Sequence, residues 1–367
     1  MDIQALAEIM ADLFATAGAR MTIAPYGNGH INDTFLLVTH APTGQQRYIL
    51  QRLNGSVFLH PKEVMENIIG VTHYLAEQKK LHDDLTRMQV LTLVPAKSGA
   101  PYLTDTDGNV WRLYDFVEHT VSHEKPDSPE WFENSGCGFG DFFRLLGSYP
   151  AKTLHETIVN FHNTPVRLAQ LEDAIARDPM GRVKEVSSEI AFVKGHRDLI
   201  SALRSQLEDG SLPLRVTHND TKLNNVLLDE QTGESVCVID LDTVMPGLIA
   251  YDFGDSIRFG TNTAAEDEQD LRKCHFSMEL YEAFARGYLA HAGSALTDAE
   301  VLSLPMGAIL MTLECGIRFL ADHINGDVYF KIHREGHNLD RCRTQFKLVA
   351  EMVAQREKME QIVLSLH

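Results

Sequence analysis

The stretch between Arg215 and Asp242 constrains the fold of this chain most strongly. It holds two short apolar runs that end in polar side chains, Arg-Val-Thr-His-Asn-Asp-Thr-Lys-Leu-Asn-Asn and then Ser-Val-Cys-Val-Ile-Asp-Leu-Asp. Acidic and amide groups at the ends of buried strands are costly unless something pairs with them. Because a divalent cation and a phosphate chain are suitable partners, the stretch indicates a site built at the ends of two strands.

The spacing of these polar residues specifies the chemistry. His218 and Asp220 form His-x-Asp, Lys222 follows two positions later, and Asn225 stands five positions after the aspartate. This is the pattern of a kinase catalytic loop. We expect Asp220 to accept the proton of the attacking hydroxyl and Lys222 to neutralise the transferring phosphoryl group. Asn225 and Asp240 offer the hard oxygen ligands that Mg²⁺ prefers, and His218 is expected to hydrogen-bond the loop backbone. Two plain strands with polar turns would leave this fixed spacing unexplained.

A literal Asp-Phe-Gly triplet begins at Asp252. In protein kinases the aspartate of this triplet binds the metal and follows the catalytic asparagine closely. Here Asp240 lies 15 residues after Asn225, whereas Asp252 lies 27 residues after it. Because Asp240 also ends a predicted strand and Asp252 opens a predicted helix, we assign the metal to Asp240, with Asp242 as a candidate helper. Asp252 is expected to hold the loop.

Upstream of this stretch, the sequence predicts a sheet of five strands with helices over 3–17 and 63–81. Apolar runs and alternation give the strands as Met21–Tyr26, Thr34–Thr39, Arg47–Leu53, Met88–Pro95 and Val110–Val117. The first turn contains Gly27 and Gly29, which would let the backbone approach a nucleotide phosphate. A plain hairpin would use the same glycines.

The third predicted strand departs from the general kinase pattern. Gln51 stands where a strand lysine would hold the α- and β-phosphates, and Arg52 follows it on the opposite face. Gln51 is therefore the candidate nucleotide contact, but the phosphate clamp stays unassigned. Glu66, in the next predicted helix, is either a partner for that clamp or part of a solvated face.

Phe116, Val117 and Glu118 stand at the end of the last predicted strand of the sheet. In a bilobal kinase, adenine would hydrogen-bond to backbone at this position, so we predict a sheet-containing N-terminal lobe over 1–118 and a helical C-terminal lobe over 119–367. The C-terminal part shows helical periodicity over 184–208, 267–292, 299–323 and 341–365. The segment after Asp240 is too short for a long activation loop, which favours a small-molecule acceptor over a protein.

Composition excludes several other classes. The formal net charge of −18 argues against nucleic acid or an anionic membrane as a partner. The five cysteines are scattered without a metal-binding spacing, so neither zinc nor disulfides are expected. The start has no basic signal-peptide region, and no apolar run approaches the length of a membrane span, so we expect a cytoplasmic enzyme. The sequence leaves the oligomeric state open.

The chain resembles the aminoglycoside phosphotransferase and choline kinase superfamily of small-molecule kinases, and within it the N-acetylhexosamine 1-kinases. The resemblance extends from about residue 20 to about residue 350. The stretches that carry it are Tyr26–Asn32, Arg47–Gln51, Phe116–Ser122, Arg215–Asn225, Asp252–Gly260 and Glu314–Asp322. It implies an α+β, protein-kinase-like bilobal fold with Mg-ATP between the lobes. The glutamine on the third strand also belongs to this subfamily.

The resemblance further implies an acceptor pocket for an N-acetylhexosamine whose anomeric hydroxyl lies against the catalytic aspartate. His30 and Asn32 would contribute from the glycine-loop side. Arg318, in a mostly apolar predicted helix, would contribute from the other side. Phe259 and Tyr329 would supply apolar walls. Hydroxyls buried without partners are costly, so directional polar groups of this kind are required.

Three alternatives remain at this stage. Arg318 would also be explained by a buried pair with Glu314 or Asp322, each one helical turn away. In place of an N-acetylhexosamine, the acceptor would be another hexose, a choline-like alcohol or an aminoglycoside. In the third alternative, the protein binds nucleotide without catalysis. The intact set of Asp220 and its metal ligands counts against the last reading.

Overall fold

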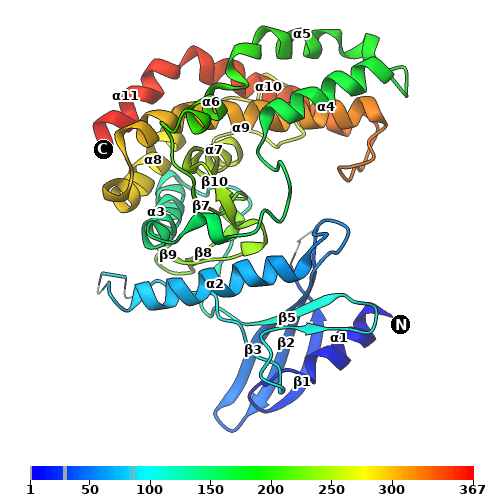
Figure 1. Cartoon of the computed structure of the whole chain (residues 1–367), viewed down its shortest axis with the longest axis vertical. Coiled ribbons are helices and arrows are strands. Elements are labelled where there is room, and N and C mark those ends of the chain that lie inside the picture. Colours follow the sequence, from blue (N-terminus) through cyan, green and yellow to red (C-terminus); the bar gives the residue numbers. More distant parts are fainter. Residues whose placement is uncertain (1, 28–30, 83, 86) are drawn as a thin grey trace.

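A five-stranded antiparallel sheet forms the N-terminal lobe. This computed structural model describes residues 2–27, 31–82, 84–85 and 87–367. The strand order is β1-β2-β3-β5-β4. The strands are β1 (Ala19–Pro25), β2 (Asp33–Ala41), β3 (Gly44–Arg52), β4 (Leu103–Thr104) and β5 (Val110–Asp115). Four of the predicted strands thus match β1, β2, β3 and β5. Figure 1 shows this lobe in blue and cyan, below the helical lobe.

The prediction of a regular strand over Met88–Pro95 is wrong. The segment runs beside β5 and makes one isolated bridge, Leu93 with Tyr114. The amide of Val94 donates to the carbonyl of Leu113 at 2.8 Å, so the segment does lie at the sheet. It shares that edge of β5 with the short strand β4, which pairs with Val110 and Trp111. Proline at 95 has no N–H and cannot extend the ladder.

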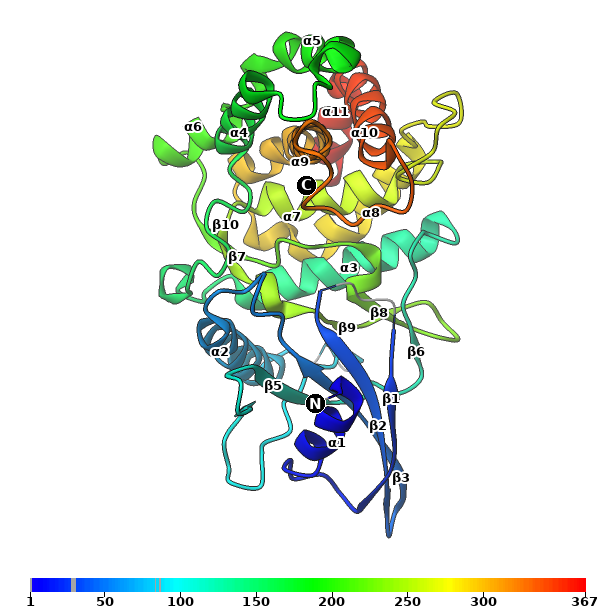
Figure 2. The same cartoon turned by 90° about the vertical axis from the view of Figure 1, so that its right-hand side faces the viewer.

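Helix α1 (Ile3–Ala11) covers one face of the sheet (Figure 2). It packs on a separate apolar cluster that includes Leu37, Leu50 and Trp111. The helix ends before the predicted residue 17 because the chain turns to pair with residues 95–97, which precede β4. Phe14 is fully buried and forms a bridge with Ala96.

The C-terminal lobe is mainly helical, as predicted. Its helices are α3 (Pro129–Leu146), α4 (Thr164–Arg177), α5 (Ser187–Gly195), α6 (Ala202–Glu208), α7 (Ile249–Gly260), α8 (Met278–Ala292), α9 (Asp298–Asn325), α10 (His337–Ala354) and α11 (Arg356–Leu366). The predicted helix 184–208 is two helices with a 3₁₀ turn between them. The prediction over 267–292 is correct only from Met278 onward, and the prediction over 341–365 is broken at Gln355.

Helix α2 (Pro61–Lys79) lies between the two lobes (Figures 1 and 2). Its buried side chains belong to the large apolar core of the helical lobe, not to the cluster under α1. Asn67 is buried and donates to the carbonyls of His155 at 2.9 Å and Val244 at 3.0 Å. A helix from the N-terminal half is therefore tied to the loop that follows β9.

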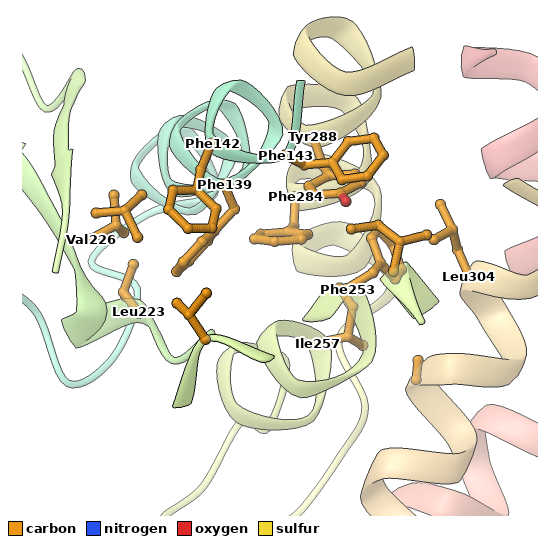
Figure 3. Close-up of a cluster of buried hydrophobic side chains, with 14 of the residues drawn as sticks. Phe139, Phe142, Phe143, Leu223, Val226, Phe253, Ile257, Phe284, Tyr288 and Leu304 are labelled. Carbon is orange, nitrogen blue, oxygen red and sulfur yellow. The ribbon is translucent and has the colours of Figure 1, made fainter. Parts of the chain in front are cut away.

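Two small sheets carry the site. Strand β7 (Arg215–Thr217) pairs with β10 (Met245–Gly247), and β6 (Thr120–Val121), β8 (Val226–Asp229) and β9 (Ser235–Val238) form the other sheet. The loop from β7 to β8 rests on a core of aromatic side chains from α3, α7 and α8. Figure 3 shows Leu223 and Val226 beside Phe139 and Phe142 within that core.

Helices α7 and α9 cross at glycine positions. A Cβ on Gly254 would lie 2.3 Å from the carbonyl oxygen of Gly307, and one on Gly307 would lie 2.0 Å from that of Ala250. Any larger side chain at either glycine would therefore separate the helices. The crossing fixes α7 beneath the catalytic loop.

Helix α9 is long and apolar enough to cross a membrane by length and composition, which the sequence analysis did not anticipate. It is the single such helix in the described ranges, with a mean hydropathy of 1.4 over the relevant window. Of that window, 83% is buried inside the protein. Its position at the centre of the helical lobe accounts for its apolar character.

Candidate active site

His218 anchors the catalytic loop to the structure beneath it. The side chain is fully buried, and its Nε2 atom lies 2.8 Å from the carbonyl oxygen of Ile239. The rings of Phe139 and Phe142 flank it, each at 5.9 Å between centroids. The amide of Asp220 donates to Nδ1 at 3.3 Å. Because a carbonyl can only accept, Nε2 carries the proton and Nδ1 is the acceptor. The predicted role of His218 in holding the loop backbone is confirmed.

Asp252 holds the same loop from α7. Its two carboxylate oxygens accept the backbone amides of His218 and Asn219, both at 2.7 Å. Burial raises the pKa of Asp252 to about 6, although these two hydrogen bonds oppose the rise. Asn219 has a φ of 64°, an uncommon backbone conformation that the two bonds help to maintain. The predicted structural role of Asp252 is confirmed.

Asp220 and Lys222 form an ion pair on the loop. Lys222 Nζ lies 2.8 Å from Asp220 Oδ1, and the side chains are 35% and 20% exposed, respectively. Protein surrounds both groups, yet they keep access to solvent. Burial raises the pKa of Asp220, but Lys222 and His218 outweigh it, so the pKa is lowered. The carboxylate is therefore ionised at neutral pH, as a proton acceptor must be.

Asn225 and Asp240 have the properties of metal ligands. Asn225 donates from Nδ2 to the backbone oxygen of Asp220 at 2.8 Å, so its Oδ1 is left to face a cation. Asp240 is exposed in the site and has no hydrogen bond or ion pair with any described side chain. Although the side chain reaches solvent, the protein around its carboxylate reduces the solvation of the charge; this effect, followed by the charges of Asp242 and Asp220, raises the pKa of Asp240 to about 6.

This donor set fits Mg²⁺. No group of three His, Cys, Asp or Glu side chains suited to a metal occurs in the described part of the chain. An all-protein cage is therefore not formed there. Mg²⁺ usually takes only one or two protein ligands and completes its shell with water and substrate phosphates. One amide oxygen and one unpartnered carboxylate meet that requirement.

Asp242 is bound by side chains of the N-terminal lobe. Its Oδ1 pairs with Arg112 Nη1, and its Oδ2 accepts from Asn32 Nδ2 at 2.6 Å. Gln51 lies beside them and accepts two hydrogen bonds from Arg112, at 3.0 and 2.8 Å. The side chains of Asn32 and Gln51, both predicted to touch ligands, are thus engaged with protein partners at this junction.

The predicted adenine segment connects the lobes. The Phe116 amide donates to the carbonyl of Arg47 at 3.2 Å, and the carbonyl of Val117 accepts from Thr120 Oγ1 at 2.9 Å. The carboxylate of Glu118 pairs with the guanidinium of Arg47. Among the described residues, the carbonyl of Phe116 and the amide of Glu118 have no hydrogen-bond partner.

The predicted glycine loop is described only in part. Gly27, two residues after β1, has a φ of 76°. No atom lies within 4 Å of the position that a Cβ would take there. Gly29 and His30 lie outside the described residues, so their predicted roles stay predictions.

Arg318 projects from α9 without an acidic partner among the described residues. Glu314 pairs instead with His162 at 3.1 Å and Thr164 at 2.6 Å. Asp322 accepts three backbone amides after α9, from residues 328 to 330. Both alternative partners are therefore occupied, and the buried-pair explanation is wrong.

Aromatic rings surround the guanidinium of Arg318 instead. The rings of Phe161, Tyr329 and Phe330 lie 5.9, 5.8 and 5.3 Å from it. Arg318, Tyr329 and Phe330 line a cavity of about 250 Å³ together with Arg167 from α4. Burial, and then the positive charge of Arg318, lower the pKa of Arg167. A larger cavity of about 680 Å³, between α3 and α8, contains none of the predicted site residues.

His162 contacts both the catalytic loop and Glu314, which lies one helical turn before the cavity-lining Arg318. Its Nε2 lies 3.0 Å from the carbonyl oxygen of Asn219, and its Nδ1 faces Glu314 one turn before Arg318. Phe259, predicted as a wall, is half-buried on α7 with the guanidinium of Arg258 above its ring at 5.8 Å.

Sequence reasoning missed three groups of the site. Arg112 interrupts an apolar strand, Val-Trp-Arg-Leu-Tyr, and a charge at the centre of such a run was the available signal. His162 carried only the weak signal of a lone histidine. Asp255 lies close enough to raise the pKa of Lys222. Its Oδ2 is buried without a hydrogen-bond partner in the described structure.

The sheet lobe, the helical lobe and the catalytic loop at their junction define a kinase-like phosphotransferase. Residues 22–297 match the model of the Phosphotransferase enzyme family, which is more than half of the chain. The chain belongs to this family and is a small-molecule kinase, as the sequence predicted. The predicted bilobal fold is also confirmed.

Solved structures support the same fold. A microcompartment-associated aminopropanol kinase superposes with a TM-score of 0.64 at 17% identity, covering 98% of this chain and 99% of that one. A spectinomycin phosphotransferase in complex with ADP and spectinomycin gives 0.57 at 12% identity, covering 97% and 98%. A choline kinase from Cryptosporidium parvum Iowa II gives 0.56 at 13% identity, covering 100% and 98%.

Proposed function

We propose that this protein transfers the γ-phosphoryl group of ATP to the anomeric hydroxyl of an N-acetylhexosamine, forming the sugar 1-phosphate. Similar structures were solved with ADP and with AMP, which supports a nucleotide donor. The free carbonyl of Phe116 and the free amide of Glu118 offer an acceptor and a donor two residues apart for the adenine edge.

The catalytic loop supplies the chemistry in this proposal. Mg²⁺ bound by Asn225 and Asp240 would neutralise charge on the phosphates. Asp220 orients the acceptor hydroxyl and accepts its proton, which its lowered pKa allows. Lys222 moves its charge from Asp220 toward the transferring phosphoryl group as that proton arrives, because the protonated carboxyl no longer attracts it.

The acceptor assignment rests on one observation, the unpaired guanidinium of Arg318 in an aromatic-lined cavity. A guanidinium donates in a fixed fork, which suits the hydroxyl and acetamido oxygens of a sugar. Rings such as that of Tyr329 provide a flat apolar surface for a sugar face. His162 contacts Glu314, one turn before Arg318, and the carbonyl of Asn219 beside Asp220, which supports placing the acceptor between Arg318 and the catalytic loop.

The same observation weighs against the cationic alternative. Choline and aminoglycosides are positively charged, and Arg318 lies close enough to Arg167 to lower its pKa. Asp173 and Arg177 in the same lining pair with each other, and Asp322 accepts backbone amides. The two guanidinium groups without an acidic partner are therefore expected to repel a third cation. An uncharged hexose of another type is the remaining alternative, since it meets the same arginine fork without an N-acetyl group.

An acceptor screen tests the proposal. ATP consumption is measured with N-acetylglucosamine, N-acetylgalactosamine, glucose, galactose, choline, aminopropanol and one aminoglycoside. The N-acetylated sugars should give the highest kcat/KM. Their methyl glycosides, whose anomeric oxygen is blocked, should be inert, and ³¹P NMR should show an anomeric phosphate. Higher kcat/KM for an amino alcohol, or turnover of the methyl glycosides, would contradict the proposal.

A further inference from the structure

The N-terminal lobe has no lysine at the usual place on β3, but a different cation lies beside that place. Gln51 stands directly opposite Arg112 in the ladder between β3 and β5. Gln51 Oε1 accepts from Nε and Nη2 of Arg112, and Gln51 Nε2 donates to Thr34 Oγ1 at 3.1 Å. Both ends of the Gln51 amide are therefore used to orient the guanidinium across three strands.

The side chain of Arg112, held in this orientation, reaches the other lobe and pairs with Asp242. Its side chain is 1% exposed, and that of its ion-pair partner Asp242 is 3% exposed. Asn32 holds the second oxygen of Asp242, and the ring of Tyr114 lies 5.1 Å from the guanidinium. Such a buried pair needs good geometry and further hydrogen bonds to offset the desolvation of both charges, and both are present.

The ion pair adjoins the predicted metal ligand. Asp242 lies two residues after Asp240, within the 3₁₀ turn Leu241–Thr243, and Asp240 has a φ of 60°. Burial alone would lower the pKa of Arg112, but the charges of Asp242 and Asp240 raise it. The guanidinium therefore binds Asp242 directly, and the short turn joins this ion pair to Asp240.

The other residues that could replace the strand lysine, or pair with it, are engaged elsewhere. Glu66 on α2, the candidate partner of a strand lysine, pairs with His155 at 2.8 Å on an exposed surface. Arg52 pairs with Asp33, and its side chain is 30% exposed. Arg112 is thus the buried cation that β3 and β5 direct toward the metal loop.

We propose that Arg112 is a positioning residue for phosphoryl transfer. By holding Asp242, it fixes the turn that carries Asp240 and joins the sheet of the N-terminal lobe to the metal loop. The inference rests on the Mg-nucleotide part of the proposed function and is independent of the acceptor.

Calorimetric titration with ADP, in excess Mg²⁺ and in EDTA, tests this role without turnover. Arg112→Met should weaken Mg-ADP binding about tenfold or more, as loss of outer-shell support for a metal ligand does. Binding of ADP in EDTA should be unchanged. Arg112→Lys should recover part of the loss because it keeps the charge without the fork. Arg52→Met is the matched control and should bind Mg-ADP like the wild type.

A second variant separates positioning from folding. Arg112→Met alone leaves Asp242 buried without its cation, which is destabilising. Arg112→Met with Asp242→Asn removes both charges and should fold, yet it should still bind Mg-ADP weakly. Wild-type Mg-ADP affinity in either variant, or an equal loss with and without Mg²⁺, would overturn the inference. Wild-type protein that binds no Mg-ADP would overturn the proposed function as well.

Discussion

Lys222 Nζ lies 2.8 Å from Asp220 Oδ1, so the proposed base and the proposed phosphate-binding cation are each other's partner. The charge of Asp220 raises the pKa of Lys222, and that of Lys222 helps to lower the pKa of Asp220. Both groups are therefore charged at neutral pH. Each supports the charge state that the other needs for phosphoryl transfer.

We expect Asp220→Asn to bind nucleotide normally and to lose at least about 100-fold in kcat, because the amide keeps the shape but cannot accept a proton. Steady-state kinetics and ADP titration measure the two effects. Asp229→Asn, at the end of β8, is the control and should retain activity. Near-normal turnover by Asp220→Asn would remove Asp220 from the mechanism.

Asp240→Ala should abolish most Mg-dependent turnover, by about 100-fold or more, because it removes the carboxylate ligand from a hard cation site. The variant should fold, since no described side chain pairs with Asp240. Turnover is measured across a Mg²⁺ titration, and folding by circular dichroism. Unchanged Mg²⁺ dependence would move the metal to another residue.

Asp252→Ala should instead lower the free energy of unfolding by about 3 kcal/mol, because two buried backbone amides lose their acceptor. Urea unfolding measures this change. The folded fraction of Asp252→Ala should show the same dependence of turnover on Mg²⁺ concentration as the wild type. A metal-bound structure with Asp252 as a direct ligand would show that the literal Asp-Phe-Gly triplet had been wrongly dismissed.

Arg318→Ala should raise the acceptor KM about tenfold or more while leaving the ATP KM nearly unchanged, because it removes charge-assisted hydrogen bonds to the acceptor alone. Arg177→Ala is the control: Arg177 lines the same cavity but already pairs with Asp173. Equal effects of Arg318→Ala on both KM values would argue against an acceptor role.

The pair of His162 and Glu314 should make stability depend on pH. Burial disfavours the charged form of both side chains, but the hydrogen bond and the attraction between them have the larger effect. The pKa of His162 is therefore raised and that of Glu314 is lowered. The contribution of His162 is full below its ordinary pKa and is lost as pH rises through the raised value. That of Glu314 is lost as pH falls through its lowered value.

His162→Gln should therefore cost about 3 kcal/mol near pH 6 and less near pH 9. Urea unfolding at both pH values measures the difference from the wild type. The control is His155→Gln, since the exposed pair of His155 and Glu66 should contribute under about 1 kcal/mol. A cost for His162→Gln that grows between pH 6 and pH 9 would contradict the assignment.

The catalytic loop could be predicted because its residues are close in sequence and its spacing follows from one local turn. His218 and Asp252 took their expected structural roles for the same reason, since each binds a backbone fixed by that turn. The sheet was predictable wherever alternation was regular. Met88–Pro95 has strand-like composition, but β4 takes part of the edge that it would have used.

The junction of the lobes could not be predicted in this way. Arg112 and Asp242 are 130 residues apart, and no local pattern indicates that a strand arginine will meet a loop carboxylate. Arg318 shows the same limit. Glu314 and Asp322, each one helical turn away, were reasonable partners by spacing. In the structure, Glu314 pairs with His162, and Asp322 accepts backbone amides after α9.

The crossing of α7 and α9 has a consequence for inhibitor selectivity. In protein kinases the Asp-Phe-Gly triplet can change its packing between active and inactive arrangements. Here Asp252 is fixed by two amides, and a Cβ on Gly254 would meet the backbone of α9 at 2.3 Å. The triplet is part of a closely packed helix with no room to rearrange. The metal turn itself reads Asp240-Leu-Asp242, without the phenylalanine that such compounds displace in protein kinases. Compounds that select a displaced Asp-Phe-Gly triplet should therefore spare this enzyme.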